Sequence, residues 1–172
     1  MSDTAASPQS PAAPASAGGN APVQSRIDWA AFETHAGGVV GALRDYSRAV
    51  DASGLDKGLV ELLKLRASQI NGCAFCLQFH LNLARKLGLP QRQLDQLAAW
   101  RDSHAFSARE RAALAWTEAL TRMSAAPVEG TLYAELQAQF SEGEIANLTA
   151  AIAAINAWNR IAGALRFTPP GG

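Results

Sequence analysis

The stretch ELLKLRASQINGCAFCLQFH, from Glu61 to His80, holds both cysteines of the 172-residue chain and one of its three histidines. Cys73, Cys76 and His80 all fall within eight residues of one another. If Cys73 begins a helix, Cys76 lies one turn later and His80 four residues further on, so the three side chains share one face. The Asn-Gly pair just before Cys73 predicts a break between two helices.

This spacing is suited to thiol chemistry. The N-terminus of a helix and a Cys-x-x-Cys arrangement both favour the thiolate, which is the nucleophilic form of cysteine. The second thiol can close a disulfide, and an imidazole can accept or return a proton. Glu61 lies twelve residues before Cys73, and a tight turn between the two helices would bring it to the same site. Two other interpretations stay open: buried structural cysteines, or a metal site made from Cys73, Cys76, His80 and Glu61.

The rest of the chain predicts helices, because runs of alternating β-branched residues are scarce. Gly88 suits a helix C-terminus, and the two segments that begin at Ser107 and Ser141 each have a glutamate three residues later, which is the pattern of a capping box. We therefore expect an all-α fold of about seven helices. The expected helices cover residues 28–50 (with a break near the glycines at 37, 38 and 41), 56–70, 73–87, 90–101, 107–123, 130–139 and 141–166.

The last expected helix is apolar nearly all the way round, which predicts that it lies under other helices or in a subunit interface. It also contains three polar residues, Asn156, Asn159 and Arg160. Polar groups in a buried helix need hydrogen-bond partners. We predict that these residues form a network, either under the cysteine-bearing helix or across a subunit interface.

Composition favours a globular protein, with 48% hydrophobic and 17% charged residues and a formal net charge of zero. That balance favours neither nucleic acid nor a membrane as a partner, and no apolar run reaches the roughly 18 residues of a transmembrane helix. Residues 1–25 are rich in Ala, Ser, Pro and Gly and are predicted to be disordered. They lack the features of a secretory signal, so a cytoplasmic protein is expected, with one helical domain over 26–172.

The spacing of Glu61, Cys73, Cys76 and His80 resembles that of the AhpD-like alkylhydroperoxidase group of the carboxymuconolactone decarboxylase superfamily. The resemblance covers residues 28–167 approximately and includes LRASQINGCAFCLQFH and AAINAWNRIAGALRF. It implies a domain of packed helices that assembles into homo-trimers or homo-hexamers. The true decarboxylases of the superfamily lack the cysteine pair, so the pair argues against decarboxylation.

The resemblance also implies a mechanism. Cys76 would attack hydrogen peroxide or an organic hydroperoxide, and Cys73 would resolve the resulting sulfenic acid as a disulfide. Glu61 and His80 would form a proton relay, an external dithiol would reduce the disulfide, and no metal or organic cofactor would take part. The sequence departs from the best-studied members at Phe75, where they have a second histidine, and this makes the site more apolar.

Two other functions stay open. One is a thiol–disulfide oxidoreductase that acts on a protein partner. The other is a non-enzymatic helical assembly in which the cysteines are structural or bind a metal. The peroxidase function and the oxidoreductase function both require thiols that cycle between reduced and disulfide forms. Structural cysteines would be inert.

Overall fold

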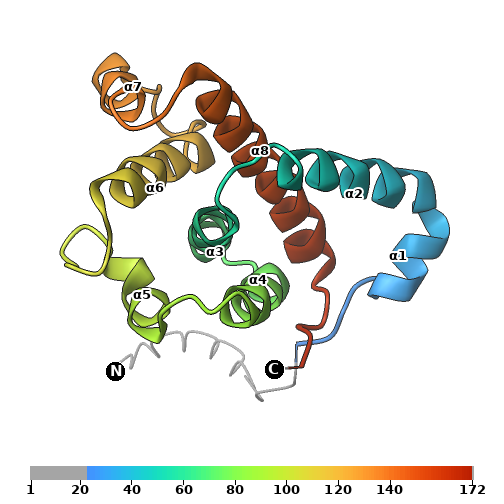
Figure 1. The fold of residues 1–172 in the computed structure, drawn as a ribbon. Coiled ribbons are helices and arrows are strands. Elements are labelled where there is room, and N and C mark those ends of the chain that lie inside the picture. The colour runs from blue at the N-terminus through green and yellow to red at the C-terminus, as the bar shows by residue number, and fades with distance from the viewer. Residues whose placement is uncertain (1–22, 172) are drawn as a thin grey trace, which may run out of the picture.

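The computed structural model describes residues 23–171, and every regular element in that range is a helix (Figure 1). The all-α prediction is therefore confirmed. Residues 23–171 form eight α-helices, against the expected number of about seven, because the segment 28–50 divides at Ala36, whose ψ of 31° departs from helical geometry. Residues 1–22 of the predicted tail lie outside the described residues. The helices are α1 (Trp29–His35), α2 (Gly37–Asp51), α3 (Lys57–Asn71), α4 (Ala74–Lys86), α5 (Gln91–Gln96), the 3-10 helix η1 (Leu97–Ala99), α6 (Ala108–Thr121), α7 (Gly130–Gln137) and α8 (Glu142–Leu165).

Local chemistry sets where these helices begin and end. Ser107 and Ser141 each form the predicted capping box, which satisfies backbone N–H groups that a helix N-terminus leaves without partners. Gly72 ends α3 with a φ of 64°, and Gly88 follows α4 with a φ of 79°. Residues with a side chain rarely adopt this left-handed conformation, so glycine at these two positions allows the chain to turn sharply.

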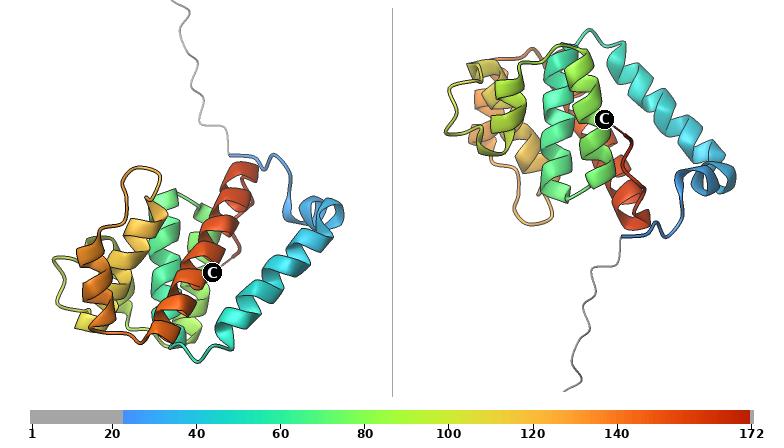
Figure 2. Two further views of the ribbon diagram at one scale, coloured as in Figure 1. Left: turned by 90° about the horizontal axis from the view of Figure 1, so that it is seen from above. Right: turned by 90° about the horizontal axis from the view of Figure 1, so that it is seen from below.

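Helix α8 is the centre of the domain and packs against α2, α3, α4 and α6 (Figures 1 and 2). Its residues Leu148, Ile152 and Ile155 are buried, as are Leu62 and Leu63 of α3. Each such side chain contributes about 1.5–3 kcal/mol through burial of apolar surface. The prediction that the last helix lies under other helices is confirmed.

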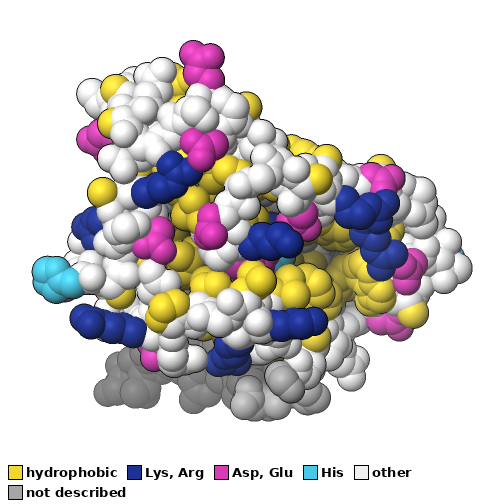
Figure 3. Space-filling view, in the orientation of Figure 1, with side chains coloured by type: hydrophobic (Ala, Val, Ile, Leu, Met, Phe, Trp, Pro, Cys, Tyr) yellow, Lys and Arg dark blue, Asp and Glu magenta, His cyan; other side chains and the backbone are white. Residues whose placement is uncertain are grey.

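Helices α1 and α2 form an arm at one edge of the molecule (Figures 1 and 2). Helix α2 buries only Val40 and Val50 within the chain, while Val39 and Tyr46 are exposed. Hydrophobic side chains also reach the surface between this arm and the rest of the bundle (Figure 3). The homo-oligomer stays a prediction.

Within 23–171, no helix combines the length and apolar character that a membrane span needs.

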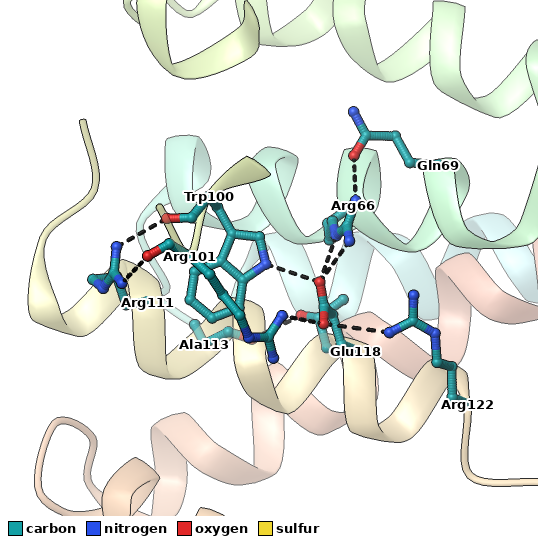
Figure 4. A network of polar contacts seen from close by, with 9 residues as sticks. Arg66, Gln69, Trp100, Arg101, Arg111, Ala113, Glu118 and Arg122 are labelled. Carbon is teal, nitrogen blue, oxygen red and sulfur yellow. Dashed lines mark hydrogen bonds and ion pairs between the residues drawn. The ribbon is translucent and has the colours of Figure 1, made fainter. Parts of the chain in front are cut away.

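A buried carboxylate joins α6 to its neighbours (Figure 4). Glu118 of α6 accepts hydrogen bonds from Arg66 of α3, at 2.7 Å, and from the indole N–H of Trp100, at 2.8 Å. Arg101 and Arg122 also pair with this carboxylate. Burial would raise the pKa of Glu118, but these donors outweigh it and lower the pKa to about 2. The network therefore holds an ionised glutamate inside the bundle.

Candidate active site

The turn between α3 and α4 places Cys73 at the N-terminus of α4. The backbone N–H of Cys73 donates to the carbonyl of Ser68, at 3.1 Å, just after the left-handed Gly72. Cys73 is the N-cap residue, and its Sγ accepts a hydrogen bond from the backbone N–H of Cys76, at 3.3 Å. The two thiols are not joined by a disulfide, and their residues are only 1% and 3% exposed. A reagent must therefore pass other side chains to reach either sulfur.

The pKa values of the two thiols are shifted in opposite directions. A hydrogen bond from the Cys76 side chain lowers the pKa of Cys73 to about 7 despite burial, with help from backbone N–H groups and the amide of Asn159. The same hydrogen bond to Cys73, together with burial, raises the pKa of Cys76 above its ordinary range. These opposite shifts favour the negative charge on Cys73 and the proton on Cys76 in the reduced pair.

The structure brings Glu61 of α3 to His80 of α4. Glu61 Oε2 lies 2.7 Å from His80 Nδ1, and the two residues are only 5% and 8% exposed. Burial would raise the pKa of Glu61, but its contacts with His80 and with the ammonium of Lys64, 3.0 Å from Oε1, hold that pKa below its ordinary value. An ionised carboxylate only accepts hydrogen bonds, so His80 Nδ1 carries the proton and Nε2 is the basic nitrogen.

The four predicted site residues form two pairs. Cys73 contacts Cys76, and Glu61 contacts His80, while His80 follows Cys76 by one turn on the same face of α4. No group of three His, Cys, Asp or Glu side chains in residues 23–171 converges with metal-ligand geometry. The arrangement therefore suits proton and sulfur chemistry better than the coordination of a metal by all four residues.

A network of amides connects α8 to the turn before Cys73. Asn71 Nδ2 donates to Oδ1 of both Asn156 and Asn159, at 3.0 and 2.8 Å, and Asn159 Nδ2 donates to Ser68 Oγ, at 3.0 Å. Arg160 donates to Asn156 from the exposed side. The predicted network is confirmed and lies within the chain, where α8 meets the cysteine-bearing turn.

Aromatic rings cover the cysteine pair. Phe75, between the two cysteines, stacks on Trp29 of α1 with 6.3 Å between ring centroids, and meets the edge of Phe167 at 5.5 Å. These rings pack in one cluster with Cys73 and Cys76. The thiols consequently lie in an apolar environment to which the arm contributes.

A cavity of about 360 Å³ reaches Glu61 between α2, α3 and α4. Its walls include Val50, Leu55 and Leu83, and Lys86 lines it as well. Glu61 therefore both contacts His80 and lines this cavity.

Sequence reasoning missed Lys64 and the hydrogen bond from Asn159 to Ser68. Lys64 lies three residues after Glu61 on one helix, a spacing that brings opposite charges together and could have been noticed. Asn159 lies 91 residues from Ser68 in the sequence, and only the packing of α8 against α3 brings them together.

Comparisons with known proteins agree with this geometry. The sequence model of the carboxymuconolactone decarboxylase family matches residues 38–119. The uncharacterized protein YdfG of Bacillus subtilis (strain 168) is 34% identical over 119 residues, which are 69% of this chain and 81% of YdfG. The similarity to YdfG therefore extends over most of both chains.

Solved structures share the fold. A protein of unknown function from Agrobacterium tumefaciens, with AhpD-type antioxidant defence as its suggested role, superposes with a TM-score of 0.82 at 36% identity, covering 87% of this chain and all of that one. The debrominase Bmp8 superposes with a TM-score of 0.73 at 21% identity over 80% of this chain and 74% of its own, which shows the fold alone. The chain belongs to the carboxymuconolactone decarboxylase family, in its AhpD-like group.

Proposed function

We propose that the protein is a thiol peroxidase that reduces hydroperoxides through the Cys73–Cys76 pair, with an external dithiol as reductant. One observation carries the proposal. The two thiols contact each other, and the one that keeps its proton, Cys76, lies one turn from the histidine that Glu61 holds. Membership of the AhpD-like group supports the same reaction.

In the first step, Cys76 Sγ attacks the terminal oxygen of the hydroperoxide. An S–O bond forms, the O–O bond breaks, and Cys76 becomes a sulfenic acid while the substrate becomes an alcohol. The raised pKa of the Cys76 thiol means that a base must take its proton. His80 Nε2 is suited to take it and to return it to the departing alkoxide, because Glu61 stabilises the imidazolium formed in between.

In the second step, Cys73 attacks the Cys76 sulfenic acid. A disulfide forms, the S–O bond breaks, and the departing hydroxide takes a proton to become water. The backbone N–H of Cys76 donates to Cys73 Sγ, at 3.3 Å, and this contact favours the thiolate that the attack requires. An external dithiol then reduces the disulfide by exchange and restores both thiols.

The proton relay formed by Glu61 and His80 provides the first test of the proposed function. Replacing Glu61 with glutamine removes the charge that stabilises the His80 imidazolium, so the rate of hydroperoxide reduction should fall roughly 10²–10⁴-fold. The rate is measured with cumene hydroperoxide and dithiothreitol under conditions in which peroxide reduction is limiting.

Asp51→Asn is the matched control, because Asp51 lines the same cavity but its carboxylate is 55% exposed and pairs with Lys64, at 3.9 Å. Its rate should stay within about threefold of the wild type, in keeping with the small energies of exposed ion pairs. Equal rates in Glu61→Gln and the wild type would show that Glu61 takes no part in the reaction.

Thiol–disulfide exchange is the second candidate, and the lowered pKa of Cys73 favours it. A low-pKa cysteine at a helix N-terminus is typical of the attacking thiol in such enzymes. The burial of both cysteines weighs against a protein disulfide as substrate, because the aromatic cluster lies over them. In this function Cys73, rather than Cys76, would attack first.

A further inference from the structure

The two oxygens of the Glu61 carboxylate have different partners. Oε1 lies 3.0 Å from the ammonium of Lys64, and Oε2 lies 2.7 Å from His80 Nδ1. The side chains of Glu61, Lys64 and His80 are only 7%, 14% and 11% exposed, so salt and water screen these contacts weakly. Because Lys64 holds Oε1, the carboxylate is oriented with Oε2 towards the imidazole. Lys64 is thus placed to act on His80 through Glu61.

The same contacts decide how charge is balanced at this site. Ionised Glu61 carries one negative charge and the ammonium of Lys64 carries one positive charge, so these two groups are neutral together. Within residues 23–171, Lys64 and His80 are the ion-pair partners of Glu61. Without Lys64, an imidazolium on His80 would be the one cation beside a buried carboxylate, and the imidazolium would be favoured. An imidazolium has no basic nitrogen, so it could not take the proton of Cys76.

Other charged side chains near this carboxylate are exposed or paired elsewhere. Asp51 of α2 lies 3.9 Å from the ammonium of Lys64, but its side chain is 55% exposed. Lys57 and Lys86 line the cavity between α2, α3 and α4, and both residues are exposed. On α6, which also packs against α3, Glu118 pairs with three arginines. Lys64 is therefore the little-exposed cation that compensates the carboxylate of the relay.

We infer that Lys64 is a positioning residue that keeps His80 ready to act as a base, by orienting Glu61 and compensating its charge. Within the proposed function, on which this role rests, His80 Nε2 must be unprotonated when the hydroperoxide arrives. Glu61 alone would favour the imidazolium before the reaction as well as during it. Lys64 moderates this preference, so that His80 is neutral at rest and charged only while it holds the proton of Cys76.

The test is a proton NMR titration of the His80 imidazole in the reduced protein. The chain has only three histidines, and comparison with His80→Gln assigns the signal. Lys64→Gln removes the cation, so His80 should keep its extra proton to a pH about one unit higher than in the wild type. Lys64→Met, a second neutral variant of similar length, should behave in the same way.

Two variants serve as controls in the same titration. Lys64→Arg keeps the positive charge and should titrate within about 0.3 units of the wild type, as expected if charge is what matters. Lys86→Gln removes an exposed lysine from the cavity that reaches Glu61, and it should also stay within that range because exposed charges act weakly.

The pH dependence of hydroperoxide reduction shows whether this compensation matters to the reaction. In Lys64→Gln the acidic side of the pH–rate profile should move to higher pH by about one unit, so the rate there should fall about tenfold and recover as the pH rises. Loss of stability alone would lower the temperature of unfolding without moving the profile.

An unchanged His80 titration in both neutral Lys64 variants would overturn the inference. An equal change in Lys86→Gln would also overturn it, because the effect would then come from the general charge of the cavity. The titration uses no peroxide, so its result is separate from the proposed function. A protein without peroxidase activity whose His80 titration still moves in Lys64→Gln retains the compensation, and an active peroxidase in which it does not move lacks it.

Discussion

A Cys76→Ser variant is expected to lose hydroperoxide reduction by about a thousandfold or more. A serine hydroxyl does not form the sulfenic acid that carries the first step, and the chain has no other thiol besides Cys73. The loss should appear in single-turnover experiments as well as in steady state, because the first bond-forming step itself is removed. The measurement is the consumption of one equivalent of cumene hydroperoxide by the fully reduced variant.

Cys73→Ser is the comparison that separates the two roles. This variant should consume one equivalent of hydroperoxide, stop as a sulfenic acid on Cys76, and fail to turn over with dithiothreitol at the wild-type rate. The reverse pattern, with Cys73 oxidised in Cys76→Ser and no reaction in Cys73→Ser, would assign the attack to Cys73. That result would agree with the lowered pKa of Cys73 and would favour the thiol–disulfide function.

Glu118→Gln is expected to cost about 3 kcal/mol or more in the free energy of unfolding at pH 7, because it breaks a buried ion pair and leaves Arg66 without its counter-ion. The Glu118 side chain is 6% exposed and that of Arg66 is 13% exposed, so water replaces little of the lost interaction. Chemical denaturation of both proteins measures the difference.

The pH dependence of this difference has a definite sign. The pKa of Glu118 is lowered from 4.5 to about 2 on folding, so its contribution to stability is complete above about pH 4.5 and is lost as the pH falls towards 2. The wild type and Glu118→Gln should therefore converge in stability on acidification. Glu61 and Glu144 also have lowered pKa values, and comparing the two proteins at each pH cancels their contributions.

Glu33→Gln is the control for burial. Glu33 pairs with Arg44 at 2.8 Å, but the two side chains are 42% and 51% exposed. Exposed pairs of this kind contribute about 0–1 kcal/mol. If Glu118→Gln cost no more than Glu33→Gln, or if its cost were the same at pH 3 and pH 7, the ionised glutamate would not be the stabilising element.

The parts of the fold that the sequence predicted are those set by local chemistry. Capping boxes at Ser107 and Ser141 and the left-handed glycines at 72 and 88 act within one turn of the chain, so their residues identify the helix ends. Helix periodicity likewise placed Cys73, Cys76 and His80 along α4. The division of the first helical segment at Ala36 was expected only approximately, because several glycines nearby could have broken it.

The parts that could not be predicted depend on how distant helices pack. Arg66 and Glu118 are 52 residues apart, and nothing in either local sequence indicates the other. The same is true of Trp29 and Phe75, which meet only because the arm lies beside α4. The contact between Glu61 and His80 could be predicted only in part. The Asn-Gly turn made it feasible, and the family resemblance indicated that the two residues belong to one site, but only the structure shows the contact at 2.7 Å.

The most direct measurement is a count of free thiols before and after one equivalent of cumene hydroperoxide is added to the reduced wild-type protein. Both thiols should disappear together, with a Cys73–Cys76 disulfide identified by mass spectrometry and both thiols restored by dithiothreitol. Survival of both thiols would contradict the peroxidase function. The buried pair would then have to act on disulfides, bind a metal or serve only in packing.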